Sequence, residues 1–138
     1  MKDGDNSYRA TSHATFQLRY HLVLVTKYRR KCLTKNMIEF IKENAAQILR
    51  NQGCILEELN GEADHVHILF SSVPSVRLSD LVALLKSRLS RKTRQKFAEH
   101  LSKYYWKPFL WSRSYFITTT GGATVEIIRG YIERQGRK

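Results

Sequence analysis

Cysteine is scarce in this chain, which contains two, Cys32 and Cys54, with no short spacing between them. Disulfide frameworks and zinc knuckles use closely spaced cysteines, so neither is expected, and both thiols are predicted to pack in the core. Long apolar runs are also missing: no segment approaches the roughly 18 apolar residues of a membrane span, and no signal-peptide core follows Met1. The sequence therefore predicts a soluble, cytoplasmic protein that does not bind a membrane.

Acidic residues are few as well. The 138 residues contain 12 Asp and Glu against 24 Lys and Arg, and the formal net charge is +12. The positive excess is clustered, as in Lys27-Tyr28-Arg29-Arg30-Lys31. A clustered excess of this kind is the electrostatic footprint of a protein that binds nucleic acid. A merely basic, soluble domain is the alternative that charge by itself leaves open.

No linker divides the chain, and 42% of its residues are hydrophobic, so residues 1–138 are expected to form a single domain. Residues 1–13 are polar and patternless, which predicts a loose terminus. Alternating apolar residues predict strands, and a 3.6-residue apolar period predicts helices. The predicted strands cover residues 15–25, 55–59, 64–70 and 115–119, and the predicted helices cover residues 34–52, 79 onward and 123–135.

Short turn signals connect these elements. Thr34 or Asn36 can cap the first helix, and Gly53 can end it. Asn60-Gly61 predicts a tight turn between two paired strands, and Gly121-Gly122 predicts a flexible joint before the last helix. The resulting β-α-β-β-α-β-α order predicts a ferredoxin-like α+β fold of the split β-α-β type. This fold has a four-stranded antiparallel sheet with two helices on one face, here with an appended C-terminal helix that carries a tyrosine.

Two histidines, His65 and His67, lie two positions apart in the predicted strand 64–70. Side chains two apart on a strand point to the same face, about 7 Å from each other, so the pair can share one cation. Two such histidines alone are weak evidence, because an exposed strand face can carry a polar strip by chance. Their position strengthens the interpretation, since Val66, Ile68 and Phe70 already supply an apolar face for the core. The remaining histidines have no partner at ligand spacing and are predicted to lie outside the site: His13, His21 and His100.

Tyr131 and Gln135 are four residues apart and therefore share a face of the last predicted helix. A tyrosine on an amphipathic helix is usually a packing residue, but here the apolar residues form a separate stripe, so Tyr131 is not required as a core contact. Gly130, whose mid-helix position costs roughly 1 kcal/mol, leaves room beside the phenol for a DNA backbone. Imidazole nitrogens from His65 and His67, with the amide oxygen of Gln135, would suit Mg²⁺ or Mn²⁺. Such an ion would polarise a scissile phosphate while the phenol attacks phosphorus.

Several short motifs occur in the order found in one known family. They are Tyr20-His21-Leu22-Val23, Lys27-Tyr28-Arg29-Arg30-Lys31, Asp64-His65-Val66-His67-Ile68-Leu69, Leu110-Trp111 through Tyr115, Thr120-Gly121-Gly122 and Tyr131-Ile132-Glu133-Arg134-Gln135. In this ordered combination the chain resembles the single-tyrosine HUH transposases, the small transposases of insertion sequences that move as single-stranded DNA. The resemblance spans about residues 16–135.

The resemblance implies a metal-dependent DNA transposase of a prokaryotic cell, which cleaves and rejoins single-stranded DNA at insertion-sequence ends. It implies that His65, His67 and Gln135 bind the divalent ion, Mg²⁺ or Mn²⁺, and that Tyr131 becomes joined to the 5′ phosphate of the cleaved strand. The free 3′-OH later attacks a phosphotyrosine and reseals the strand. Family members are homodimers that bind subterminal DNA hairpins. The tyrosine helix of one subunit can complete the histidine pair of the other, so active sites assembled in cis or in trans are both open.

Two basic clusters are the predicted contacts to hairpin phosphates, and such contacts make binding salt-dependent. They are Arg29, Arg30 and Lys31, and Lys86, Arg88, Arg91, Lys92 and Arg94. Two alternatives remain. One is an HUH nickase of the replication-initiator or relaxase type, or a domesticated relative that processes palindromes. The other is a non-catalytic ferredoxin-like module that stacks bases on exposed aromatic rings without cutting them.

Overall fold

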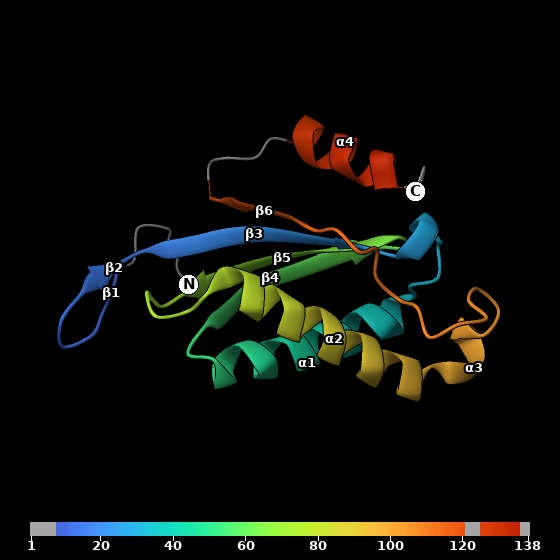
Figure 1. Ribbon diagram of the computed structural model, residues 1–138, viewed down its shortest axis with the longest axis horizontal. Helices are drawn as coiled ribbons and strands as arrows, with labels where there is room; N and C mark the ends of the chain where they lie inside the picture. Colours follow the sequence, from blue (N-terminus) through green and yellow to red (C-terminus); the bar gives the residue numbers. More distant parts are fainter. Residues whose placement is uncertain (1–7, 121–124, 136–138) are drawn as a thin grey trace.

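The computed structural model describes residues 8–120 and 125–135 (Figure 1). Its strands are β1 (Arg9–Ala10), β2 (Thr15–Phe16), β3 (Leu18–Val25), β4 (Ile55–Glu62), β5 (His65–Ser72) and β6 (Phe116–Thr119). Its helices are the 3₁₀ turn η1 (Lys27–Arg29), α1 (Lys35–Asn51), α2 (Leu78–Lys96), α3 (Ala98–Leu101) and α4 (Val125–Gln135). All the predicted strands and helices are found, and β1, η1 and α3 are additional. None of the helices in the described ranges combines the length and the apolar composition that crossing a membrane requires.

The main sheet has four strands in the order β4-β5-β3-β6, and every neighbouring pair is antiparallel. α1 and α2 lie against one face of the sheet, whereas α4 lies over the opposite face (Figure 1). This order and pairing are those of the split β-α-β fold, so the predicted ferredoxin-like α+β class is confirmed. The sheet therefore separates a layer of two helices from α4.

The alternation of side chains along β3 and β5 divides them between these two faces. Those that point toward α1 and α2 are apolar and fully buried: Leu22, Leu24, Val66, Ile68 and Phe70. On the other face a smaller apolar cluster joins β3 to α4: Val23, Val25, Tyr131 and Ile132. Cys32 and Cys54 are buried free thiols, as predicted. Nε2 of His100 lies 2.7 Å from the backbone oxygen of Cys32, so His100 lies away from His65 and His67, as predicted.

The predicted tight turn at Asn60-Gly61 is wrong. β4 continues to Glu62 and β5 begins at His65, so that Gly61 pairs with Val66 inside the ladder. A Cβ atom on Gly61 would lie 2.7 Å from the backbone oxygen of His65, a distance that the backbone would have to shift to relieve. Glycine is required here because two strands approach closely, and not because the chain turns.

Local signals at the ends of α1 are confirmed. The side-chain oxygen of Thr34 accepts a hydrogen bond of 3.2 Å from the backbone N–H of Met37, so Thr34 is the N-cap. Gly53 follows the helix with φ +79°, a left-handed conformation that glycine adopts without strain. The prediction that residues 1–13 form a loose terminus is wrong at residues 9 and 10, which form β1 and pair with β2 although they carry no strand pattern. Residues 1–7, the predicted joint at 121–122, the predicted helix start at 123–124 and its predicted end at 136 lie outside the described residues.

Candidate active site

His65 and His67 lie on β5, on the face of the sheet that carries α4. The residues paired with them on β3, Val25 and Val23, belong to the apolar cluster under α4, which identifies the face. Both histidine side chains are partly exposed. They line a cavity of about 450 Å³ whose walls include Arg29, Asp64, Ile128, Arg129 and Ile132. The same-face placement predicted from the two-residue spacing is therefore confirmed, and a cavity is present beside the pair.

The carboxylate of Asp64 orients the first of these rings. Nδ1 of His65 lies 2.9 Å from Asp64 Oδ1, and Nε of Arg29 donates to Asp64 Oδ2 at 3.0 Å. Burial acts to raise the pKa of Asp64, but the hydrogen bonds from His65 and Arg29 together outweigh it and hold that pKa below its ordinary value. An ionised carboxylate can only accept, so Nδ1 of His65 is the donor in this bond, and Nε2 is the ring nitrogen that Asp64 leaves unused. A histidine held in this way by a carboxylate is a common arrangement for a metal ligand.

The η1 turn that carries Arg29 is strained. Tyr28 and Arg29 both have positive φ, 59° and 56°, although neither is glycine. A left-handed conformation costs a non-glycine residue roughly 1–3 kcal/mol and persists only where its surroundings enforce it. Here the hydroxyl of Tyr105 donates to the backbone oxygen of Lys27 at 2.6 Å and anchors the start of the turn. The turn brings Arg29 back onto Asp64, and strain of this kind concentrates at functional sites.

The prediction that His21 lies outside the site is wrong. Its Nδ1 lies 2.8 Å from Nε2 of His67, and the two rings stack with centroids 4.8 Å apart and planes inclined by 16°. His21 is diagonal to His67 across the ladder, because Val23 is the β3 residue paired with His67. Burial is the largest cause that lowers the pKa of each ring, followed by the charge of Arg19 for His21 and by His21 itself for His67. Both rings are therefore neutral at neutral pH. Spacing along the sequence did not reveal this neighbour, because it stands on another strand.

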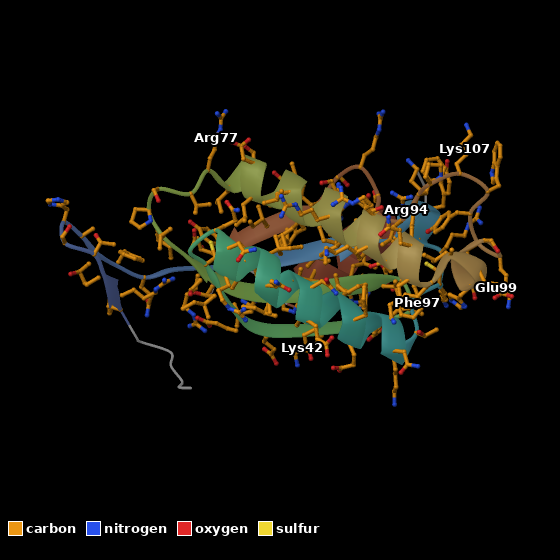
Figure 2. All side chains as sticks on the ribbon, turned by 90° about the horizontal axis from the view of Figure 1, so that it is seen from below. Lys42, Arg77, Arg94, Phe97, Glu99 and Lys107 are labelled. Atoms are coloured by element: carbon orange, nitrogen blue, oxygen red, sulfur yellow. The ribbon has the colours of Figure 1, made fainter. Side chains whose placement is uncertain are left out.

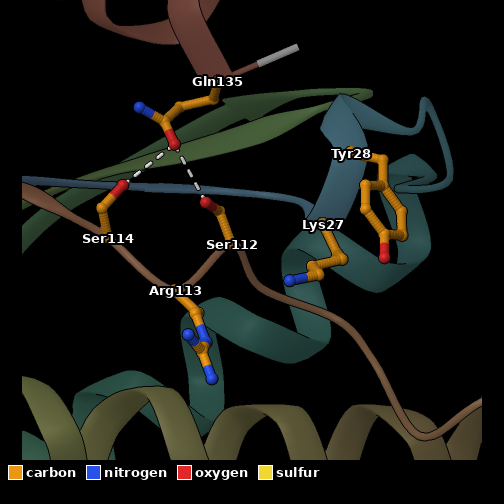
Figure 3. A pocket seen from close by; sticks show the side chains of 6 residues that line it. All are labelled: Lys27, Tyr28, Ser112, Arg113, Ser114 and Gln135. Atoms are coloured by element: carbon orange, nitrogen blue, oxygen red, sulfur yellow. Dashed lines mark hydrogen bonds between the residues drawn. The ribbon is translucent and has the colours of Figure 1, made fainter. Parts of the chain in front are cut away.

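Tyr131 and Gln135 lie on the buried side of α4 and share Ser114 as a hydrogen-bond partner. The hydroxyl oxygens of Tyr131 and Ser114 are 2.9 Å apart, and Ser114 Oγ donates to Gln135 Oε1 at 2.9 Å. Ser112 Oγ donates to the same oxygen at 2.9 Å (Figure 3). Because Ser114 gives its single hydroxyl proton to Gln135, the phenol of Tyr131 must be the donor in the Tyr131–Ser114 bond. Burial raises the pKa of Tyr131 above its ordinary value, which keeps this donor protonated.

The prediction that Tyr131 is not needed as a core contact is wrong. Its side chain is 8% exposed, and its ring packs against Phe116 of β6 with centroids 5.6 Å apart. Ile132 and Gln135 are buried beside it. The stripe expected from the sequence was Val125, Ile128 and Ile132, and Val125 is 65% exposed. The buried side of α4 is therefore rotated from the stripe expected from its sequence, since the polar groups of Tyr131 and Gln135 are satisfied by serines under the helix.

Tyr131 and Gln135 do not line the cavity beside the histidine pair. α4 presents other side chains to that cavity: Val125, Ile128, Arg129, Ile132 and Glu133. Gln135 instead lines a smaller cavity of about 210 Å³ above the Ser112–Ser114 segment (Figure 3). In the part of the chain that the structure describes, no three His, Cys, Asp or Glu side chains are placed to hold one metal ion. A cation at the histidine pair would therefore need ligands beyond those already gathered there.

Comparison with known protein families gives the affiliation of this chain. The family model described as "Transposase IS200 like" matches residues 14–135. The chain belongs to the IS200-like transposase family. The resemblance drawn from the ordered motifs is thereby confirmed, and the family is one of enzymes that cut and transfer DNA strands.

Relatives of this transposase match it over most of their length. The ISDra2 transposase TnpA of Deinococcus radiodurans is 32% identical over 123 residues, which cover 89% of this chain and 87% of the relative. The transposase for insertion sequence element IS200 of Salmonella typhimurium is 26% identical over 127 residues, covering 92% and 82%. A Deinococcus radiodurans R1 protein, crystallised as a transposase, superimposes with a TM-score of 0.80 at 31% identity and covers 98% of both chains. A REP-associated tyrosine transposase bound to a REP hairpin gives a TM-score of 0.55 at 9% identity, covering 96% and 69%, which shows a likeness of fold alone.

The basic residues predicted to bind DNA differ in their surroundings in this transposase. Arg29 is paired with Asp64, and Lys86 Nζ donates to the backbone oxygens of Ser112 and Arg113 at 2.8 and 2.7 Å. Arg88 and Arg94 are partly exposed, and the exposed members of the set are Arg30, Lys31, Arg91 and Lys92. Figure 2 looks onto α1 and α2 and shows Arg94 on the outer side of α2. The α2 cluster therefore lies across the sheet from the histidine pair, and Arg29 stands beside the pair.

Proposed function

We propose that this transposase cleaves and rejoins single-stranded DNA at insertion-sequence ends, with Tyr131 as the nucleophile that takes the 5′ phosphate. The observation that carries the proposal is the pair of His65 and His67 beside a cavity, with His65 oriented by the ionised Asp64. An oriented histidine pair on a sheet face is a site for a cation, and a cation beside a tyrosine helix suits phosphodiester chemistry. Membership of the transposase family supports the same reading.

We infer that His65 and His67 hold a divalent ion, Mg²⁺ or Mn²⁺, with Gln135 as a further ligand. The residues fit such an ion, because Asp64 binds only Nδ1 of His65 and leaves its Nε2 for a ligand bond, and Gln135 carries an amide oxygen. When bound, the ion would act as a Lewis acid on the scissile phosphate. The protein's own contribution is to fix the ring of His65 through Asp64, which Arg29 in turn holds.

Tyr131 carries the group transfer in this proposal. Its phenol loses a proton and its oxygen attacks phosphorus, the bond from phosphorus to the 3′ oxygen breaks, and that oxygen takes a proton to become a 3′-OH. The 5′ phosphate stays on Tyr131 as an ester. A 3′-OH then attacks this ester, the strand is resealed and the phenol is regenerated. Each step exchanges one phosphate ester for another, so neither ATP nor hydrolysis is needed.

We propose that the two halves of the site come from two subunits of a homodimer. Within one chain Tyr131 and Gln135 bond to Ser114, whereas His65 and His67 face a cavity that other α4 residues line. The α4 of a second copy would supply the nucleophile and the amide ligand in trans. A catalytically active monomer in sedimentation would contradict this arrangement.

Mixing two inactive variants distinguishes assembly in trans from assembly in cis. In a heterodimer of His67→Ala and Tyr131→Phe, a site built in trans combines the intact His67 of one subunit with the intact Tyr131 of the other. Cleavage should therefore return to about half of the wild-type level per heterodimer. With sites built in cis, each site of the heterodimer has one defect, and no activity returns.

The DNA partner that we propose is a single strand with subterminal hairpins. A net charge of +12 and exposed basic side chains just after η1 and on α2 support backbone contacts of this kind. The REP-associated transposase of similar fold was solved with a REP hairpin, which is a precedent from that protein. Because affinity would reside in the basic residues, His67→Ala should abolish cleavage and leave hairpin affinity nearly unchanged. An equal loss of cleavage and of hairpin affinity would contradict this separation of roles between His67 and the basic residues.

Covalent trapping tests the central step. Wild type and Tyr131→Phe are incubated with single-stranded and duplex oligonucleotides tiled across the DNA flanking the gene, with Mg²⁺ or Mn²⁺, and separated under denaturing conditions. The expected result is a protein–DNA adduct from wild type alone, on a single strand near a hairpin, and dependent on metal. Hairpin binding without an adduct on any tile would favour a non-catalytic binding module. An adduct at a replication origin or a transfer origin would favour a nickase.

A further inference from the structure

We propose that Trp106 is a stacking residue for an unpaired base of single-stranded DNA, on a positively charged surface at one end of the sheet. The inference rests on the proposed function for its DNA partner, because it names how this protein holds the single strand near the candidate active site. Its starting point is the exposure of Trp106, which at 87% exceeds that of every other large apolar side chain in residues 8–120 and 125–135. The second tryptophan, Trp111, is 8% exposed and packs in the core.

The loop that carries Trp106 is held in place on both sides of this residue. Tyr105 is buried, and its hydroxyl donates to the backbone of η1 at 2.6 Å. Nη1 of Arg30 donates to the backbone oxygen of Tyr104 at 2.6 Å, and the ring of Phe109 packs edge-on against that of Tyr105, with centroids 6.2 Å apart. The indole therefore projects from a fixed loop. A ring that is held in this way loses little conformational freedom when a ligand binds it.

The two segments that meet at this end of the molecule are positively charged. Residues 26–34 and 102–113 contain four and three Lys or Arg, respectively, and neither segment contains Asp or Glu. Asp64, which contacts η1, is already paired with Arg29. A phosphate backbone is complementary to such a surface, and aromatic rings among basic side chains are what proteins use to bind single strands. The charge therefore favours a nucleic acid as the occupant.

An exposed indole beside a cation suits an unpaired base better than a paired one. Nζ of Lys107 lies 4.9 Å from the centroid of the Trp106 ring, so an ammonium group stands next to any base that stacks there. Its charge can meet a phosphate that flanks this base. In a duplex the neighbouring bases cover both faces of each base, whereas an unpaired base offers a free face to an aromatic ring. The pair of Trp106 and Lys107 therefore favours a single strand.

Tyr28 connects this surface to the candidate active site. Its ring is 44% exposed and packs edge-on against Phe109 of the same loop, with centroids 6.0 Å apart. Arg29, the next residue, is bonded to Asp64, which orients His65. α3 and the loop after it lie at the end of the sheet where η1 follows β3 (Figure 1). A strand whose base stacks on the indole can therefore follow η1 toward the histidine pair.

Binding of a thymidine oligonucleotide to the full-length protein, without metal, tests the inference. Affinity is measured by fluorescence anisotropy of the labelled single strand over a range of salt concentrations, and a duplex of the same length is measured beside it. The variants are Trp106→Leu, Trp106→Phe and Lys107→Met. Tyr8→Leu is the matched control, because Tyr8 is 67% exposed and adjoins β1, which lies at the opposite end of the sheet from α3 (Figure 1). Circular dichroism confirms that each variant is folded.

We expect Trp106→Leu to weaken binding of the single strand at least about fivefold. The slope of log affinity against log salt should not change, because stacking involves no phosphate charge. Trp106→Phe keeps an aromatic ring and should retain most of the affinity. Lys107→Met should lower the slope by about 0.7, the contribution of one phosphate contact on a single strand. Tyr8→Leu should bind like wild type.

Unchanged affinity of Trp106→Leu for the single strand would overturn the inference. An equal loss of affinity for the duplex would also overturn it, because the ring would then contact a feature that both forms of DNA share. Tryptophan fluorescence gives an independent check. The single strand should quench the fluorescence of wild type and not that of Trp106→Phe, since the remaining Trp111 is buried.

Covalent trapping separates this inference from the proposed function. If wild type forms the protein–DNA adduct and Trp106→Leu binds the single strand like wild type, this inference alone fails. If Trp106→Leu loses affinity but wild type forms no adduct on any tile, base stacking stands and the nucleophilic role of Tyr131 fails.

Discussion

Tyr131 and Ser114 join α4 to the segment before β6 through one bond between hydroxyl groups, 2.9 Å long. The hydroxyl of Ser114 donates its hydrogen bond to Gln135. In the bond between Tyr131 and Ser114 the phenol is therefore the donor. The contact therefore holds Tyr131 as a neutral, buried donor. Under the proposed function, Tyr131 has to leave Ser114 before its oxygen can reach a phosphate at a histidine pair.

The raised pKa of Tyr131 predicts a loss of stability at high pH. Burial raises this pKa above the ordinary value of 10.0, so the folded protein keeps the phenol proton at a pH where the unfolded chain releases it. The corresponding stabilisation is fully present below about pH 10 and is lost as the pH rises through the folded-state pKa. Urea unfolding of wild type and Tyr131→Phe at neutral pH and above pH 10 should show that wild type loses more free energy of unfolding.

The same pair of proteins gives a spectroscopic check. The difference in tyrosinate absorbance between wild type and Tyr131→Phe isolates one phenol among the seven tyrosines. Its midpoint should lie above 10.0, the ordinary value. A midpoint at or below that value would show that Tyr131 is exposed in solution and that the contact with Ser114 is not its resting position.

Lys86 is predicted to stabilise the fold and not to bind DNA. Its ammonium group donates to the backbone oxygens of Ser112 and Arg113, next to the partners of Gln135. Lys86→Met keeps the apolar stem but removes these charge-assisted bonds, so the free energy of unfolding should fall by about 1.5–3 kcal/mol. Denaturant titration at neutral pH measures this loss.

Lys92→Met is the matched control, because Lys92 is exposed on the same helix. It should leave stability unchanged and lower the slope of log affinity against log salt by about 0.7–0.9, the contribution of one phosphate contact. Lys86→Met should not alter that slope. The opposite pattern, with Lys86→Met stable and the slope reduced, would assign Lys86 to the DNA.

Gly61 is predicted to be irreplaceable, and Gly130 is not. A Cβ on Gly61 would meet the backbone oxygen of His65 at 2.7 Å, so Gly61→Ala should cost about 1–3 kcal/mol of stability and disturb His65. Among the described residues, a Cβ on Gly130 would meet only the flexible end of Arg134, at 3.4 Å. Gly130→Ala should therefore raise stability by about 0.5–1 kcal/mol. Urea unfolding compares the two variants.

Cleavage assays on Gly130→Ala test the separate prediction that this glycine makes room for a DNA backbone. A more stable protein that cleaves more slowly would support it. Unchanged cleavage would show that Gly130 has no part in DNA access.

The strands, the helices and the placement of His65 and His67 on one face could be predicted from sequence, because they depend on periodicities of two and 3.6 residues. The position of the turn between β4 and β5 could not, and the prediction at Asn60-Gly61 was wrong, because glycine is favoured where two strands approach closely as well as in turns. The contact of His21 with His67 was also hidden, since it joins two strands separated by α1 and β4 in the chain. The buried side of α4 was misjudged because serines far from the helix in sequence satisfy its polar residues.

By itself, the sequence determined the ferredoxin-like order of elements, the positive charge and the ordered motifs of an IS200-like transposase. These properties are local: each depends on residues a few positions apart or on composition. Only the tertiary structure decided that His21 stands against His67, that Arg29 holds Asp64, and that Tyr131 and Gln135 bond to Ser114 instead of facing the histidines. These relationships depend on strand register and on how α4 lies over the sheet, which are set by packing between segments distant in the chain.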